Sequence, residues 1–197
     1  MGKRATDFLV SLLGLIALSP LLLVCGLLVR TTTPGPAFFR QERVGRHGRV
    51  FRIHKFRTMT ADPMRVGREL TVGEDRRITP LGRWLRRYKV DELPQLIDVL
   101  YGDMSLVGPR PEVPKYVALY PEHEREVVLS VRPGITDPAS IEFRDESALL
   151  GRAADPERDY IEHVLPAKLA LSVEYVRQRT WVGDLVIIAR TLRAIAR

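Results

Sequence analysis

The sequence predicts an α/β protein, mainly helical with a small β-hairpin, that folds as a single compact domain behind one N-terminal membrane helix. Three observations support this fold class. An uncharged apolar run extends from Phe8 to Val29, a strand-turn-strand pattern follows at residues 37–59, and helical spacing of apolar residues dominates the rest. We expect residues 1–30 to form a membrane segment and residues 31–197 to form one modest domain, because that length does not comfortably supply two cores.

The apolar run is long enough to cross a bilayer, since about 20 apolar residues at about 1.5 Å each span a hydrocarbon core of about 30 Å. A Ser-Pro pair, Ser19-Pro20, interrupts its middle, and both flanks are basic, which marks either end as cytoplasmic. Proline removes a backbone hydrogen bond and bends the helix, while the Ser19 hydroxyl can satisfy a freed backbone group. Charge and proline alone leave two alternatives open, a spanning helix and a re-entrant helix that enters and leaves by one face.

Two further features describe the setting of this run. A cleavable signal peptide fits less well, because no small-x-small cleavage pattern follows the apolar residues. The single cysteine, Cys25, lies inside the run, which excludes a disulfide within the chain and fits a reducing, cytoplasmic setting.

The positive charge of the chain is concentrated behind the apolar run. The formal net charge is +7, and residues 30–57 carry eight cationic side chains against one acid, Glu42. Residues 76–89 add six cations and no acid. Beside a membrane segment, such stretches favour anionic headgroups, phosphorylated lipids or nucleotide diphosphates. We expect no nucleic-acid partner, because no nucleic-acid-binding motif accompanies the charge.

The expected hairpin has strands at residues 37–44 and 49–59, joined by the turn Gly45-Arg46-His47-Gly48. Residues 60–79 show no clean period and predict a loop. The remaining elements are expected to be helices, with starts near Pro80, Asp91, Glu112 and Pro156 and breaks at Pro121 and at residues 180–183.

Two of these helices have features that bear on function. Leu81, Trp84 and Leu85 should form the apolar face of the helix at residues 80–88. The last helical piece, residues 185–197, is amphipathic, and it could lie on a membrane surface or pack on the core. Both alternatives stay open.

Adjacent carboxylates, Asp91 and Glu92, stand at a predicted helix start and form the best candidate for catalysis. A cap and a favourable dipole contact are the commoner roles of such a pair. Phosphate-binding side chains around it favour catalysis, since arginine matches phosphate oxygens bidentately. These cations, each of which could instead form a structural salt bridge, are Lys55, Arg57, Arg86, Arg110 and Arg132.

If a diphosphate binds there, a carboxylate can attack phosphorus and form an acyl phosphate. A divalent metal, most plausibly Mg²⁺, would bridge phosphate oxygens and the carboxylates of Asp91 and Glu92. Zinc is not indicated, because the four histidines are scattered and Cys25 lies in the apolar run. Neither a Walker-type phosphate loop nor a serine-nucleophile elbow is present, which disfavours ordinary nucleotide and acyl hydrolases.

At these residues the chain resembles the bacterial sugar transferases known as monotopic phosphoglycosyl transferases. The matches follow the order of the family through most of the chain. They are Ser19-Pro20, Lys55-Phe56-Arg57-Thr58-Met59, Gly73-Glu74-Asp75-Arg76-Arg77-Ile78-Thr79, Leu81-Gly82-Arg83, Asp91-Glu92-Leu93-Pro94-Gln95-Leu96, Gly102-Asp103-Met104-Ser105-Leu106-Val107-Gly108-Pro109-Arg110-Pro111 and Pro133-Gly134-Ile135-Thr136.

The resemblance implies transfer of a phosphosugar from a UDP-sugar to polyprenyl phosphate, with release of UMP, at the start of glycoconjugate or exopolysaccharide synthesis. It implies that Asp91 is the nucleophile, that Glu92 assists through metal or proton handling, and that the five cations contact phosphate. It also implies that Ser19-Pro20 breaks a re-entrant helix, so that the protein is monotopic on the cytoplasmic face of the inner membrane, in contact with membrane lipid.

Departures from the family pattern concern specificity more than reaction type. Ile97-Asp98-Val99 stands where many relatives have Trp-Asn-Val, which adds a carboxylate one or two helical turns from the dyad. Two rival functions are a membrane-bound lipid-phosphate phosphotransferase or phosphatase and a non-enzymatic basic module on the membrane surface. The sequence names neither the sugar, the polyprenol length nor the oligomeric state.

Overall fold

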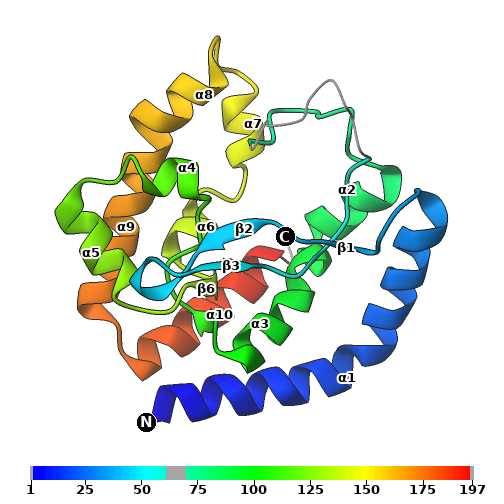
Figure 1. The fold of residues 1–197 in the computed structure, drawn as a ribbon, viewed down its shortest axis with the longest axis horizontal. Coiled ribbons are helices and arrows are strands. Elements are labelled where there is room, and N and C mark those ends of the chain that lie inside the picture. Colours follow the sequence, from blue (N-terminus) through cyan, green and yellow to red (C-terminus); the bar gives the residue numbers. More distant parts are fainter. Residues whose placement is uncertain (1, 61–69, 196–197) are drawn as a thin grey trace.

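The computed structural model describes residues 2–60 and 70–195. A long helix, α1 (Gly2–Thr32), runs along the lower edge of the molecule and then turns up beside it (Figure 1). Every other described element packs on the inner side of this bent helix, and the expected single domain, mostly helical with a few short strands, is confirmed.

The bend in α1 has the local chemistry that the sequence predicts. Pro20 lies inside the helix and has no N–H to give to the carbonyl of Ile16, four residues earlier. The Ser19 hydroxyl donates to that same carbonyl at 2.8 Å. The helix therefore continues through the proline without leaving that carbonyl unpaired.

The two ends of α1 are both attached to the domain. Near the start, Arg4 donates to the carbonyls of Val99 and Leu100 at 2.6 and 3.0 Å, and the Asp7 carboxylate accepts from the Ser105 hydroxyl at 2.7 Å. Near the end, Cys25 and Val29 are buried in a cluster that also holds three residues of the domain, namely Phe56, Leu85 and Val90. The middle of the helix carries the exposed apolar side chains, among them Leu13, Ile16 and Leu23. In composition and length it is the single helix of the described chain that could cross a membrane.

The predicted hairpin is present, interrupted in its middle. Strands β2 (Glu42–Val44) and β3 (Val50–Arg52) pair antiparallel around the 3₁₀ turn η1 (Arg46–Gly48), and β1 (Phe38–Phe39) pairs with β4 (Lys55–Phe56). A second pair, the parallel strands β5 (Ser105–Val107) and β6 (Gly134–Thr136), was not predicted. Where these strands meet, a Cβ on Gly134 would lie 2.1 Å from the Gly108 nitrogen, so only glycine permits the approach.

Helix α2 (Pro80–Arg87) begins as the sequence predicts, with the Thr79 hydroxyl accepting from the Gly82 N–H at 2.8 Å. The expected apolar face is only partly correct: Leu85 is fully buried, whereas Trp84 is 46% exposed. Trp84 instead lies against the ring of Tyr88 on the surface.

The helix expected from Asp91 has a 3₁₀ first turn. It comprises η3 (Val90–Gln95), which follows Lys89 in a left-handed conformation (φ 55°), and α3 (Leu96–Tyr101). The break at Pro121 is confirmed, since α4 (Pro114–Val117) ends before it and α5 (Glu122–Leu129) follows it. Part of the predicted loop, residues 61–69, lies outside the described residues; within the rest of it, Ile78 forms an isolated antiparallel bridge with Met59.

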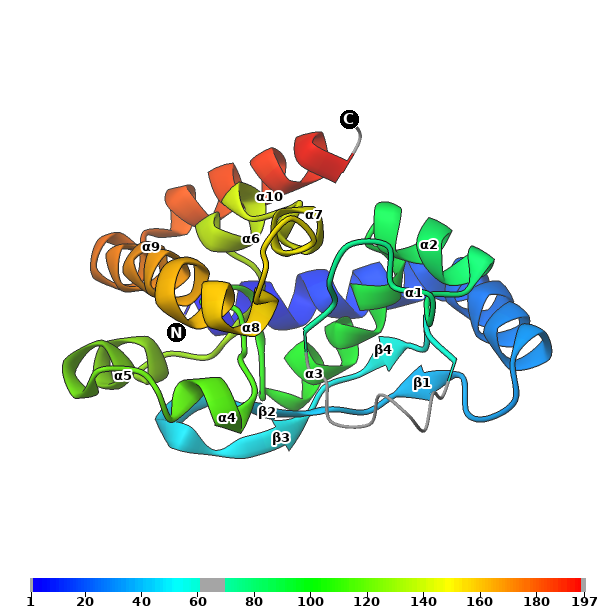
Figure 2. The same ribbon diagram turned by 90° about the horizontal axis from the view of Figure 1, so that it is seen from above.

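The C-terminal third is helical, with the expected break near residue 180. Its elements are α6 (Pro138–Glu142), α7 (Glu146–Leu150), α8 (Pro156–Asp159), the π-helix η4 (Tyr160–Val164), α9 (Leu165–Gln178) and α10 (Trp181–Ile195). Figure 2 shows α10 on the side of the molecule opposite the hairpin and α9 at the left end between them. Helix α10 packs on the core through Ile187, as one of the two alternatives predicts, while Val182 and Leu192 are exposed. Contact of this helix with a membrane surface stays a prediction.

Candidate active site

The two acids of the dyad lie in η3, which packs against both α1 and the basic strand β4. Val90, directly before Asp91, packs on Cys25 and Val29 of α1. Asp91 and Glu92 are 6% and 7% exposed, which is unusual for carboxylates. Their surroundings differ sharply, and the difference bears on what each can do.

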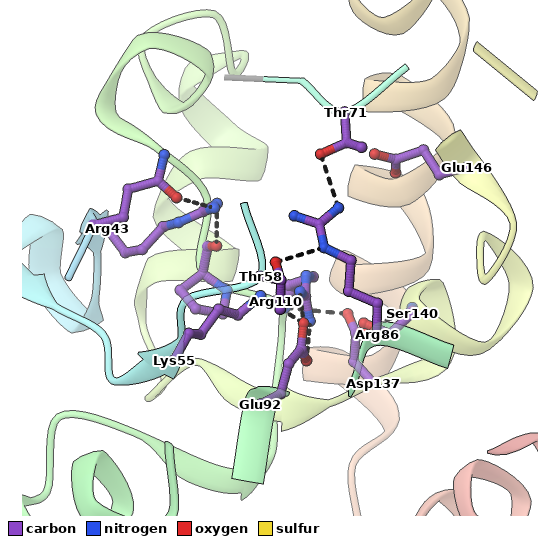
Figure 3. Close-up of polar contacts among 12 residues, drawn as sticks. Arg43, Lys55, Thr58, Thr71, Arg86, Glu92, Arg110, Asp137, Ser140 and Glu146 are labelled. Carbon is purple, nitrogen blue, oxygen red and sulfur yellow. Dashed lines mark hydrogen bonds and ion pairs between the residues drawn. The ribbon is translucent and has the colours of Figure 1, made fainter. Parts of the chain in front are cut away.

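Both carboxylate oxygens of Glu92 are bound by cationic side chains. Its Oε1 accepts from Lys55 Nζ at 2.6 Å and from Arg110 Nη2 at 2.5 Å, and its Oε2 accepts from Arg110 Nη1 at 3.1 Å (Figure 3). Burial alone would raise the pKa of Glu92, but Arg110 and Lys55 hold it well below its usual range. Glu92 therefore stays ionised near neutral pH, and its contacts do not suit it to carry a proton.

Asp91 is in the opposite condition. Its Oδ1 is buried and has no hydrogen-bond partner among residues 2–60 and 70–195. Burial raises the pKa of Asp91, and the neighbouring charge of Glu92 adds to the effect while Lys55 opposes it. A buried, unpaired carboxylate oxygen is costly, and such groups concentrate where a ligand or a reaction uses them.

Arg86 approaches the dyad from α2. Its Nε donates to the Thr58 hydroxyl at 2.8 Å and its Nη1 to the Thr71 hydroxyl at 3.3 Å (Figure 3). Helix α2 comes close enough for this because Gly82 has no side chain. A Cβ at that position would lie only 2.1 Å from the Thr58 carbonyl oxygen. Both contacts are to neutral hydroxyls, so they do not neutralise the positive charge of Arg86. Burial lowers the pKa of Arg86, and among the carboxylates that oppose this effect Asp91 is the strongest.

Arg110 projects from a loop that is fixed at successive residues. The Arg110 backbone N–H donates to Asp137 Oδ2 at 3.2 Å, and Arg43 Nη1 donates to the Pro111 carbonyl at 3.1 Å and to Glu112 Oε1 at 3.0 Å. Glu112 Oε2 accepts from the Tyr160 hydroxyl at 2.7 Å. The loop is held on both sides, which presents the guanidinium of Arg110 to Glu92 with little remaining freedom.

Two of the five predicted phosphate-binding cations contact backbone carbonyls at helix ends instead. Arg57 donates to the carbonyls of Val29, Thr33 and Pro34 at 2.7 to 3.2 Å, so it caps the end of α1. Arg132 Nε donates to the Gly102 carbonyl at 2.7 Å, just beyond the end of α3. The structure thus brings Lys55, Arg86 and Arg110 together around the dyad and directs Arg57 and Arg132 to helix ends.

Sequence reasoning missed several residues of the site. Asp137 is fully buried, and it accepts from the Ser140 N–H at 2.8 Å as well as from Arg110, so it caps α6 and fixes the loop together. The sequence Asp137-Pro138 is an ordinary helix-start signal. It predicts that Asp137 caps a helix, but it does not predict the contact of Asp137 with the Arg110 backbone. Thr58 and Arg43 had no signal of their own apart from their place in basic strands.

Comparison with known proteins identifies the family of the chain. The family model for bacterial sugar transferases matches residues 1–197. The chain belongs to the bacterial sugar transferase family. It is 36% identical over 98% of its length to the UDP-N-acetylgalactosamine-undecaprenyl-phosphate N-acetylgalactosaminephosphotransferase of Aeromonas hydrophila, of which it covers 43%. It is 39% identical over 98% of its length to the undecaprenyl-phosphate glucose phosphotransferase of Komagataeibacter xylinus, of which it covers 35%.

Shorter members of the family match over most of their own length. The exopolysaccharide production protein PSS of Rhizobium leguminosarum bv. phaseoli is 38% identical over 96% of this chain and 92% of its own. The chain thus spans less than half of the two longer sugar transferases above and nearly all of this shorter one.

Proposed function

We propose that this sugar transferase moves a phosphosugar from a UDP-sugar to polyprenyl phosphate through a covalent intermediate on Asp91. An Asp91 oxygen attacks the β-phosphorus, the bond from that phosphorus to the oxygen bridging the two phosphates breaks, and UMP leaves. An oxygen of polyprenyl phosphate then attacks the same phosphorus, and the Asp91 carboxylate departs as polyprenyl-diphosphate-sugar forms. Each step exchanges one phosphorus–oxygen bond for another and needs no redox partner.

The observation that carries this proposal is the contrast within the dyad. The nucleophile of such a reaction needs a lone pair that no hydrogen bond occupies. Asp91 Oδ1 is buried but has no hydrogen-bond partner within the described ranges, whereas both carboxylate oxygens of Glu92 are bound by cations. Lys55 and Arg86 bring positive charge to Asp91, and Arg110 brings it to the neighbouring Glu92, which suits the two phosphates of the donor and the charge that develops during transfer.

Magnesium is part of the proposal, and the residues fit it in a limited way. No group of three or more potential metal ligands occurs within the described ranges. Asp91 Oδ1 has no hydrogen-bond partner that a cation would have to displace, whereas Glu92 would have to give up Lys55 or Arg110 first. Mg²⁺ is often held by one or two carboxylates together with substrate phosphates, and when bound it would neutralise phosphate charge.

We further propose that α1 is re-entrant and that the protein sits on the cytoplasmic face of the inner membrane. Support comes from the attachment of both ends of α1 to one domain, through Lys3 to Asp184 at 2.5 Å at the start and through Arg57 at the end. A straight spanning helix would carry one end across the bilayer, away from these contacts. The basic flanks agree with this placement.

The decisive experiment measures UMP release and covalent labelling with Asp91→Asn. We expect this variant to lose turnover and to take up no label from a UDP-sugar radiolabelled in the sugar. Asp184→Asn is a matched control, because Asp184 is also 6% exposed but lies in α10, bonded to Lys3 and Tyr175. Near-normal turnover in Asp91→Asn would remove Asp91 as the nucleophile.

The same assay separates the rival functions. A lipid-phosphate phosphatase or phosphotransferase would act without nucleotide, so UMP release that depends on polyprenyl phosphate excludes it. A non-enzymatic basic module would bind lipid in a salt-dependent way with the dyad dispensable. A panel of UDP-sugars in this assay identifies the sugar.

Topology has its own test. Cysteines placed at positions 2 and 35, in a Cys25→Ser background, are labelled with a membrane-impermeant maleimide in intact cells and in inverted vesicles. A re-entrant helix leaves both positions on one side, where only inverted vesicles expose them. Labelling from opposite sides would mean that α1 crosses the membrane.

A further inference from the structure

Asp98 is a buried carboxylate that the proposed reaction does not use. It lies in α3 and is 1% exposed. The departure from the family pattern at this position predicted an extra carboxylate near the dyad. The Asp98 side chain instead binds His54, between strands β3 and β4. Asp98 Oδ2 accepts from the His54 backbone N–H at 2.8 Å, and its Oδ1 lies 2.6 Å from His54 Nδ1.

His54 is the residue directly before Lys55. It occupies the link between β3 and β4, where its ring meets Phe38 edge-on at 6.2 Å between centroids and lies 6.5 Å from the ring of Tyr101. With Asp98 ionised, the close contact at Nδ1 requires the ring to carry its proton there. Backbone and ring of His54 are thus both held by one carboxylate.

Two consecutive residues of the strand segment therefore bind two carboxylates of one helical stretch. His54 binds Asp98 in α3, and Lys55 binds Glu92 in η3, which runs directly into α3. Two attachment points fix how far the strand lies along the helix, whereas a single contact at the tip of a flexible lysine would not.

We propose that Asp98, acting through His54, is a positioning residue that delivers the Lys55 ammonium to the dyad. This inference rests on the proposed function, in which Lys55 faces the donor diphosphate. The contact does not involve reacting atoms, so its effect on turnover passes through Lys55.

The proposal makes a prediction about coupling that a merely structural role does not make. Asp98→Ala should lower kcat/KM for the UDP-sugar about 10- to 100-fold, the scale of one lost charge-assisted hydrogen bond. Lys55→Met should cause a loss of similar size. In the double variant the two losses should not multiply, and Asp98→Ala should cost less than about 2-fold further.

Conservative replacement gives a second readout. In Asp98→Asn the amide oxygen can still accept from the His54 N–H, and the amide nitrogen can donate to Nδ1 of the other ring tautomer. Kcat/KM should then stay within about 3-fold of the wild-type value, since both hydrogen bonds survive. An Asp98→Asn protein as impaired as Asp98→Ala overturns the proposal.

The experiment measures UMP release and the thermal midpoint for all variants in the same detergent. Asp184→Ala is the control: it removes a buried carboxylate of another region, and its effect should multiply with that of Lys55→Met. Where Asp98→Ala yields no folded protein, His54→Phe replaces it, because that variant keeps a ring beside Phe38 and lacks the Nδ1 donor. Multiplying losses for Asp98 or His54 with Lys55 overturn the inference, whereas an unaffected Lys55→Met overturns the role of Lys55 in the proposed function.

Discussion

The two acids of the dyad should respond to neutralisation with opposite changes in stability. Asp91→Asn removes a charge from a buried oxygen without a partner, whereas Glu92→Gln removes the anion that pairs with Lys55 and Arg110. Burying an unsatisfied polar group costs about 1–3 kcal/mol, and hydrogen bonds to charged groups contribute about 1.5–3 kcal/mol. We expect Asn at 91 to stabilise the protein by about 1 kcal/mol and Gln at 92 to destabilise it by about 2 kcal/mol.

For a chain of 197 residues, these values correspond to a thermal midpoint about 2–4 °C higher for Asp91→Asn and about 4–8 °C lower for Glu92→Gln. The assay is differential scanning fluorimetry of the purified protein in one detergent at one scan rate, because the midpoint of an irreversible unfolding transition depends on the scan rate. Asp184→Asn reports the effect of neutralising a buried acid that has partners, and it should lower the midpoint.

The pH dependence of stability tests the opposite changes in Asp91→Asn and Glu92→Gln independently. The pKa of Asp91 is raised in the folded protein, so its charge costs stability at pH values above that pKa, and the cost fades as pH falls through it. The pKa of Glu92 is lowered, so its contribution is complete above the unfolded value of about 4.3 and is lost below it. The advantage of Asp91→Asn should therefore shrink on acidification before the deficit of Glu92→Gln does. A lower thermal midpoint for Asp91→Asn at pH 7.5 would refute the inference that the buried, unpaired carboxylate of Asp91 destabilises the folded protein.

Three further predictions concern the proposed reaction, a helix cap and a close backbone contact. The acid limb of kcat/KM should lie above pH 4, the ordinary range of aspartate, because Asp91 reacts as a carboxylate and its raised pKa leaves it protonated as pH falls. Arg57→Ala should lower the thermal midpoint and leave KM for the UDP-sugar nearly unchanged, since Arg57 binds carbonyls at the end of α1; a raised KM at unchanged stability would restore it as a phosphate contact. Gly134→Ala should destabilise by about 3 kcal/mol through its clash with Gly108, as measured by the thermal midpoint, whereas Gly26→Ala, whose Cβ would lie 3.6 Å from Phe56, should be tolerated.

Local signals in the sequence predicted those parts of the fold that depend on few neighbours. The turn at residues 45–48, the cap at Thr79 and the break at Pro121 follow from residues adjacent in the chain, and the structure has all three. The parallel pair of β5 and β6 was missed because each strand has only three residues and its partner lies far along the chain. Such short strands carry too little periodicity to be recognised.

The partners of the arginines could not be read from the sequence. Composition predicts a positive region, but which carbonyl or carboxylate each guanidinium meets depends on how distant segments pack. Arg57 is two residues from Lys55, yet one binds the end of α1 and the other binds Glu92. Asp98 was recognised as unusual, and its contact with His54 could not be known until the hairpin and α3 were placed together.

Helix α1 is part of the framework that carries the dyad, and this follows from where it packs. Cys25 and Val29 share one buried cluster with Val90, the residue before Asp91, and with Phe56, the residue after Lys55. Displacement of α1 would therefore expose apolar side chains that are adjacent in the chain to both Asp91 and Lys55. Removing α1 to obtain a soluble enzyme should cost the geometry of the dyad as well as the membrane attachment, because burial of these side chains contributes about 25 cal/mol for each Å² of apolar surface.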